Sequence, residues 1–129
     1  MIVDTSALVA ILRDEPERAA YINILATNAP AKLSAGSLIE LQAVAIRKRM
    51  PDAVQAIARL IDELGIVVVA VDREQTRLAG EGMERFGQGS ATISALNFGD
   101  CFAYALAKAT GEPLLFKGDD FSKTDVVSA

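Results

Sequence analysis

Apolar and polar positions along the chain form two alternating patterns, short apolar runs and longer amphipathic segments. The short runs predict strands that are buried on both faces, as in a parallel sheet. The run IVVVAV (66–71) is the strongest of them, because it is rich in β-branched residues and is bounded by Gly65 and Asp72. Strands are expected at 1–4, 32–35, 66–71 and 112–116, with a last short strand near 125–127.

The longer segments between these runs have the apolar spacing of helices. Pro16 and Pro51 suit the first turn of a helix, and Gly65 and Gly111 follow helix ends. Strands that alternate with helices predict a single α/β domain over residues 1–129, with a mostly parallel sheet whose ligands bind at the carboxyl ends of the strands. Helices are expected at 5–13, 15–28, 36–50, 51–64, 72–87 and 97–111.

Composition restricts the setting of the protein. Hydrophobic residues make up 51% of the 129 positions, but no apolar run approaches the roughly 20 residues that cross a bilayer. The N-terminal MIVDTSALVAIL lacks a basic start and contains Asp4, so we interpret it as folded protein rather than as a signal peptide. A single cysteine, Cys101, excludes an internal disulfide and is typical of a reducing compartment. We therefore expect a cytoplasmic protein with no membrane partner.

The residue types that are absent limit the chemistry. The chain has no histidine, which excludes histidine-based acid–base catalysis and nearly every zinc site. Carboxylates, hydroxyls, lysine and arginine would have to carry any reaction. Because carboxylate oxygens are hard ligands, a metal site in this chain would select Mg²⁺ or Mn²⁺.

The net charge of −4 argues at first against a nucleic-acid partner, because phosphate binding normally needs a basic surface. Acids gathered at one metal site weaken this objection, since bound Mg²⁺ reverses the local sign. The basic run Arg47-Lys48-Arg49 fits either a phosphate-binding patch or the end of a helix, where positive charge complements the macrodipole. Both interpretations stay open.

Three of the 17 acids stand out. Asp4 follows Met-Ile-Val and precedes an apolar helix, so it lies at the tip of a strand, where a helix cap is a compatible second role. Glu40 lies in a helix so apolar that it needs either a narrow polar stripe or a cationic partner. Asp100 is the sole charge near the start of the helix FGDCFAYALA, where a cap, a metal, an arginine or a polar cleft would explain it.

Asp119 and Asp120 follow the strand that contains PLLF. Because they are adjacent, their side chains diverge, and at most one is expected to point into a shared site. By position after the strand we favour Asp119, and Asp120 would then fix the turn through backbone hydrogen bonds. Together the acids occupy strand ends and first turns of helices at several separate places, as a multidentate site for a divalent metal requires.

At this point the residues resemble a known family. The opening MIVDTSALVAIL, the SLIE of the third helix, the block NFGDCFAYALAKATGEPLLF and the closing KGDDFSKTDV are similar to PIN-domain ribonucleases, and most of all to the VapC toxins of bacterial toxin–antitoxin systems. The resemblance runs from residue 1 to about residue 127. It implies a three-layer α/β/α sandwich with a central, mostly parallel five-stranded sheet. It also implies an Mg²⁺- or Mn²⁺-dependent endoribonuclease that forms a homodimer and binds a cognate antitoxin, which occludes the site, often through a basic side chain.

Carried over residue by residue, three acidic positions of the family fall on Asp4, Glu40 and Asp100, and its hydroxyl position falls on Ser6. Asp4 and Asp100 would bind the metal directly or through water. Glu40 would bind a second metal or orient the attacking water. Ser6 would hydrogen-bond a carboxylate or a metal-bound water.

The chain departs from the family at the fourth acid. Where many members carry Thr-x-Asp, this sequence reads FKG at 116–118, so Asp119 or Asp120 must substitute, or the site has three acids. We expect Asp119 among the catalytic acids, and both Asp119 and Asp120 among the metal contacts.

Two alternatives remain. A non-catalytic metal- or phosphate-binding regulatory α/β domain, such as a receiver-like domain, also gathers acids at strand ends. A receiver would place a lone aspartate at the end of a middle strand, whereas the run at 66–71 leads into Asp72 at the start of a helix. The missing Thr-x-Asp also permits a partner-binding fold with a decayed site. Cleavage of RNA with and without EDTA separates these possibilities.

Overall fold

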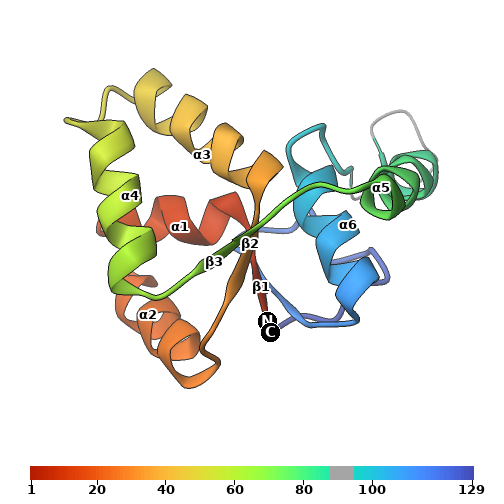
Figure 1. Cartoon of the computed structure of the whole chain (residues 1–129), viewed down its shortest axis with the longest axis horizontal. Helices are drawn as coiled ribbons and strands as arrows, with labels where there is room; N and C mark the ends of the chain where they lie inside the picture. Colours follow the sequence, from red (N-terminus) through yellow and green to blue (C-terminus); the bar gives the residue numbers. More distant parts are fainter. Residues whose placement is uncertain (88–94) are drawn as a thin grey trace.

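The computed structural model of the chain describes residues 1–87 and 95–129, and it places a narrow sheet between two groups of helices (Figure 1). The strands are β1 (Ile2–Val3), β2 (Lys32–Ser34), β3 (Val67–Val69) and β4 (Leu114–Leu115). The helices are α1 (Thr5–Leu12), α2 (Arg18–Thr27), α3 (Ala35–Arg47), α4 (Ala53–Glu63), α5 (Arg73–Phe86) and α6 (Asp100–Thr110).

The four strands form one sheet in the order β3-β2-β1-β4, and every neighbouring pair is parallel. In this register Ile2 pairs with Lys32 on one side and with Leu114 on the other. The carboxyl ends of the strands therefore meet at one edge, where β1 leads into α1 and β2 leads into α3. The predicted α/β fold with a parallel sheet is confirmed.

The last segment of the chain corrects one prediction. Where a fifth strand was expected near 125–127, the described residues contain a single bridge between Leu114 and Ser128. Leu114 N–H donates to the carbonyl of Val127 (2.8 Å), and Ala129 N–H donates to the carbonyl of Leu114 (2.9 Å). Turns and bends occupy most of 117–126, so the chain runs beside β4 for too few residues to extend the pairing.

Helices cover both faces of the sheet. Neighbouring side chains of a strand point to opposite faces, and accordingly Val3 joins a buried cluster with α1, α3 and α4, whereas Ile2 joins a second cluster with α5 and α6. Figure 1 shows these two groups of helices on opposite sides of the strands. Each fully buried aliphatic side chain contributes about 1.5–3 kcal/mol to folding. The two clusters together hold β1 in the centre of the domain.

The helix ends follow ordinary capping rules. Asp4, Ser34 and Asp72 each accept a hydrogen bond from a backbone N–H in the first turn of α1, α3 and α5. Gly111 ends α6 with a left-handed φ of 68°. The six predicted helices are present, with ends that differ from the expected ones by up to three residues. No helix within the described ranges has the length and apolar character to span a membrane.

The run IVVVAV is less buried than its composition suggests. It forms β3 at the edge of the sheet, where Val67 and Val68 are 46% and 41% exposed. A strand at the edge has only one neighbour and can leave part of its surface uncovered. The prediction of a strand here is confirmed, but its burial on both faces is not.

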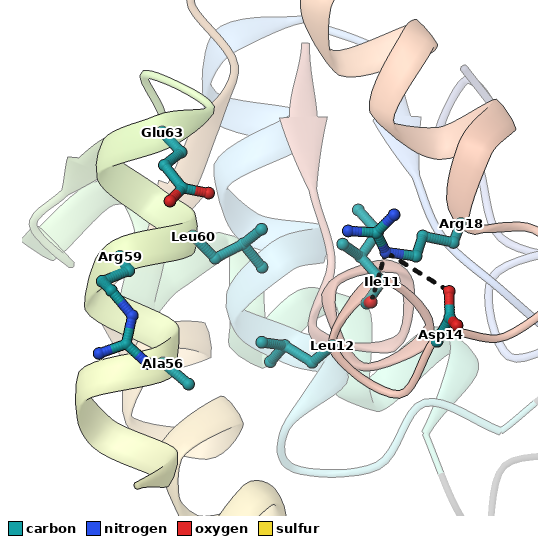
Figure 2. Close-up of a pocket in the computed structure, with 8 residues that line it drawn as sticks. All are labelled: Ile11, Leu12, Asp14, Arg18, Ala56, Arg59, Leu60 and Glu63. Carbon is teal, nitrogen blue, oxygen red and sulfur yellow. Dashed lines mark hydrogen bonds and ion pairs between the residues drawn. The ribbon is translucent and has the colours of Figure 1, made fainter.

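A hollow of about 470 Å³ opens between α1 and α4 (Figure 2). Ile11, Leu12 and Leu60 line it, and Arg18 stands near its rim. The Arg18 Nε–H donates to the carbonyl of Ile11 (3.3 Å) and lies 3.7 Å from Oδ1 of Asp14. None of the acids predicted for the active site lines this hollow.

Candidate active site

Asp4 directly follows β1 and caps α1. Its Oδ2 accepts hydrogen bonds from Ser6 N–H (2.9 Å) and from Ser6 Oγ–H (2.6 Å). The residue is only 3% exposed, and its other oxygen, Oδ1, is buried without a hydrogen-bond donor among the described residues. A buried acceptor without a donor costs about 1–3 kcal/mol. The cap thus satisfies one oxygen of this carboxylate and leaves the other one open.

Ser6 connects Asp4 to the segment after β4. While its hydroxyl donates to Asp4, its Oγ accepts a hydrogen bond from Lys117 N–H (2.9 Å). Lys117 itself forms ion pairs with Glu15 and Glu17, which anchors the segment to the connection between α1 and α2. The carboxyl ends of the two neighbouring strands β1 and β4 are thereby tied together.

Glu40 lies on α3 and reaches toward both α1 and the start of α6. Thr5 Oγ lies within hydrogen-bonding distance of Glu40 Oε2 (3.0 Å) and of the carbonyl of Ser37 (3.2 Å). A side chain on Gly99 would overlap the Glu40 carboxylate, so the lack of a Cβ at Gly99 is what lets this acid sit beside α6. Glu40 therefore has a neutral hydroxyl partner and no cationic one among the residues described.

Asp100 begins α6 and exchanges hydrogen bonds with Asn97. Asp100 Oδ2 accepts from Asn97 N–H, Asn97 Oδ1 accepts from Asp100 N–H, and both distances are 2.9 Å. This is the reciprocal arrangement of a capping box. Asp100 is 6% exposed. As with Asp4, a capping role is present and occupies one carboxylate oxygen.

The three acids are all harder to ionise than usual. Burial, reinforced by the charges of Asp4, Asp120 and Glu40, raises the pKa of Asp100 to about 7. Burial is also the main reason why the pKa of Asp4 and that of Glu40 lie above their ordinary values, and the charge of Asp4 adds to the shift at Glu40. Although they come from separate elements, these acids are near enough to act on one another.

Asp119 and Asp120 differ in their relation to these acids. The charge of Asp120 raises the pKa of both Asp4 and Asp100, whereas Asp119 contributes to neither shift. The Asp119 carbonyl accepts hydrogen bonds from Ser122 N–H (3.0 Å) and from Ser122 Oγ–H (2.7 Å). Both acids are exposed on the turn. The electrostatics thus favour Asp120 as the fourth acid, although position in the sequence favoured Asp119.

Comparison with known proteins adds to this geometry. Residues 1–127 match the model of the PIN domain. The chain belongs to the PIN-domain family. Ribonuclease VapC28 of Mycobacterium tuberculosis is 48% identical over 129 residues, which cover all of this chain and 97% of that protein. Ribonuclease VapC42 of the same species is 44% identical over 126 residues, or 98% of this chain and 96% of that protein.

Solved structures share the fold of this PIN domain. VapC20 of Mycobacterium tuberculosis, described as a toxin that cleaves the sarcin–ricin loop, matches with a TM-score of 0.78 at 21% identity over 99% of this chain and 97% of that one. VapBC2 of Rickettsia felis, solved with a fragment of its promoter DNA, matches with a TM-score of 0.70 at 18% identity, over 99% and 96%. The resemblance to VapC ribonucleases seen in the sequence is confirmed.

The acids of the PIN domain have the donor atoms that a divalent cation prefers, but their side chains are spaced more widely than a bound metal requires. Within residues 1–87 and 95–129, no three acidic or cysteine side chains converge closely enough to enclose a metal as they stand. The fit lies instead in the open Oδ1 of Asp4 and in the hard carboxylate oxygens of Asp100 and Asp120. A cation between these groups would satisfy the buried acceptor and offset the repulsion that adds to the effect of burial on the pKa of Asp4 and of Asp100.

Sequence reasoning found one partner of the acids and missed another. A cap at Asp100 was among the expected roles, and the exchange with Asn97, three residues earlier, supplies it. The contact between Thr5 and Glu40 was not predicted. Gly99 was also missed, because its role is visible only when α3 lies against α6. The structure also places the basic run: its first residue, Arg47, lies in the last turn of α3, where it complements the helix dipole.

Proposed function

We propose that this PIN domain is a metal-dependent endoribonuclease and that Asp4, Glu40 and Asp100 are its principal active-site acids. The observation that carries the proposal is the electrostatic strain among them. Each has a raised pKa, burial is the first cause, and the charge of Asp4 acts on both of the others. Buried carboxylates that repel one another destabilise the folded protein. Binding of a divalent cation that contacts RNA phosphate is a function that would account for their presence.

The residues divide the work according to their contacts. Asp4 and Asp100 would hold Mg²⁺ or Mn²⁺, with Asp120 or Asp119 as a further ligand from the turn. A bound divalent ion would neutralise charge on the phosphate oxygens and lower the pKa of a coordinated water. Ser6 fixes the orientation of Asp4 by holding Oδ2 and leaving Oδ1 available.

Glu40 is suited to handle a proton. Its Oε2 is held by Thr5, and the half-buried carboxylate has a raised pKa. The other oxygen, Oε1, can accept a proton from the water that attacks the phosphodiester, because a base with a raised pKa is closer to the working pH. Thr5 acts as a positioning residue that keeps this carboxylate facing the site.

Two protein partners belong to the proposal. A cognate antitoxin would insert a basic side chain among the acids, where a positive charge relieves the same repulsion as a metal. A homodimer would cover apolar surface on α4 and β3, where Val54, Val67 and Val68 are each more than 40% exposed. Light scattering at micromolar concentration tests the dimer. A single monomeric species, or an antitoxin complex with full nuclease activity, would contradict these assignments.

RNA cleavage tests the catalytic proposal. We expect the purified chain to cut single-stranded RNA with Mg²⁺ or Mn²⁺ and to stop when EDTA is added. Asp4→Asn and Asp100→Asn should abolish cleavage, whereas Asp62→Asn, a matched change on the exposed face of α4, should leave it unchanged. Activity that persists in EDTA or in both site variants would mean that the site is misplaced. Metal binding without cleavage would favour the regulatory alternative.

A further inference from the structure

A groove of about 610 Å³ lies beside Glu40, between α3 and the turn that leads into α6. The wall on α3 is one helix face, because the lining positions 36, 39, 40, 43 and 47 follow helical spacing. The opposite wall is formed by Asn97, Phe98, Gly99 and Phe102. Pockets of roughly 300–1,000 Å³ bind small organic groups, and this one includes an acid of the proposed active site.

The aromatic wall presents an open ring. Phe98 is 73% exposed, and its ring packs edge-on against Phe102, with centroids 5.2 Å apart and planes at 78°. Phe102 is fixed in turn, because it packs directly on the backbone of Gly36, where any Cβ would overlap its ring. Ile39, on the α3 wall of the groove, is 68% exposed. An aromatic face is therefore exposed to solvent at this groove rather than buried in the core.

The far end of the α3 wall carries a cation. Arg47 is exposed and forms no ion pair with the residues that the structure describes. The positive charge of Arg47 offsets part of the rise in the pKa of Glu40, so the two groups interact along the groove. Arg47 follows Glu40 by seven positions, which corresponds to about two helical turns, or roughly 10 Å along the helix. One wall thus has a carboxylate of the proposed catalytic site at one end, and at the other a guanidinium that pairs with no acid in the described part of the chain.

We propose that this groove binds an unpaired nucleotide of the RNA next to the scissile phosphate, with its base stacked on Phe98 and a phosphate contacted by Arg47. The inference rests on the proposed ribonuclease activity and names the part of the substrate that the same site recognises. Unstacked bases of single-stranded RNA bind on aromatic side chains, and arginine pairs with phosphate.

Binding of RNA to a chain that cannot cleave it tests the stacking contact. In the Asp100→Asn background, a single-stranded oligoribonucleotide that carries 2-aminopurine should lose fluorescence as the base stacks. Phe98→Ala should weaken its binding by roughly 5- to 150-fold, and Phe98→Tyr should restore it. Ile46→Ala is the matched control, because Ile46 is 59% exposed on the same helix but does not line the groove. Equal affinity in Phe98→Ala would overturn the proposal.

Salt dependence tests the phosphate contact separately. Each phosphate contact contributes about 0.7 to the slope of log affinity against log salt for single strands. Arg47→Gln should reduce that slope by about this amount, whereas Phe98→Ala should leave it unchanged. Arg59→Gln, on α4 and away from the groove, is the control. A slope that does not change in Arg47→Gln would overturn the assigned contact.

Two further results distinguish nucleotide binding at the groove from a protein interface there and from the proposed ribonuclease activity. Phe98→Ala could turn a dimer into a monomer and lower RNA affinity only at concentrations where the dimer has dissociated. In that case the groove is a protein interface and the inference is overturned. If the wild-type chain binds RNA through Phe98 but does not cleave it with Mg²⁺ or Mn²⁺, the proposed function is rejected and nucleotide binding at the groove is supported.

Discussion

Replacing Asp100 by asparagine should stabilise the metal-free protein, and the gain should depend on pH. The pKa of Asp100 is about 7 in the folded protein, mainly because the carboxyl is buried, against an ordinary value of 3.8. The folded state therefore holds this proton more tightly than the unfolded state. Asp100 does not reduce the free energy of unfolding below about pH 4. Its destabilising contribution grows as the pH rises toward 7 and is constant above that.

The magnitude follows from the two pKa values. Their difference corresponds to about 4 kcal/mol of stability lost at pH 8 in the absence of metal, since each pKa unit is worth about 1.4 kcal/mol. Asp100→Asn removes the charge but keeps an oxygen that can accept from Asn97 N–H. The variant should thus be more stable than the wild type by up to about 4 kcal/mol at pH 8 and by less at pH 5.

Urea unfolding from pH 5 to pH 8, with EDTA present, measures this difference. Asp62→Asn, on the exposed face of α4, should show no comparable trend with pH. Mg²⁺ should then raise the stability of the wild type by about 2.7 kcal/mol at a hundredfold excess over its dissociation constant, and should raise that of Asp100→Asn by less. An Asp100→Asn protein that is less stable than the wild type at pH 8 in EDTA would show that the cap with Asn97 outweighs the cost of burying the charge, contrary to this prediction.

Two further pairs of substitutions address the surroundings of the site. Asp120→Asn should lower RNA cleavage with little change in the melting temperature, whereas Asp119→Asn should retain cleavage; the reverse result in well-folded proteins would restore Asp119 as the fourth acid. Gly99→Ala should displace the Glu40 carboxylate and reduce cleavage, while Gly80→Ala, where an added Cβ meets no atom within 4 Å, should retain full activity and gain about 0.5–1 kcal/mol in stability. Activity assays beside thermal melts separate these effects, and an active Gly99→Ala protein would show that Glu40 can move without loss.

The helices and the parallel sheet could be predicted from the sequence because their signals are local. Apolar spacing, proline in a first turn and Gly111 at a helix end all act within a few residues of the element that they define. The position of a strand in the sheet is not local. IVVVAV has the composition of a central strand, yet β3 lies at the edge, because the order β3-β2-β1-β4 is decided by the crossover helices and their packing.

The fifth strand shows the same limit. Residues 125–127 have an apolar pair that suits a strand. After the turns between Lys117 and Val126, however, the chain lies beside β4 only long enough to form one bridge, with Leu114. The choice between Asp119 and Asp120 depends on the same turns. Gly118 has a φ of 94°, a conformation that favours glycine, and the direction in which the next two side chains leave the turn follows from it. No local pattern in the sequence encodes that direction.

Asp4 shows why capping and catalysis need not be rival explanations for an acid at a helix start. A cap needs one acceptor, and Ser6 supplies both donors to Oδ2. The same hydrogen bonds fix the plane of the carboxylate, so that Oδ1 stays buried without a donor from residues 1–87 or 95–129. Without the hydrogen bonds from Ser6, the whole carboxylate could rotate, and Oδ1 would lose its fixed position together with Oδ2. In this PIN domain the ordinary start of a helix is therefore what positions the acid proposed to bind the metal.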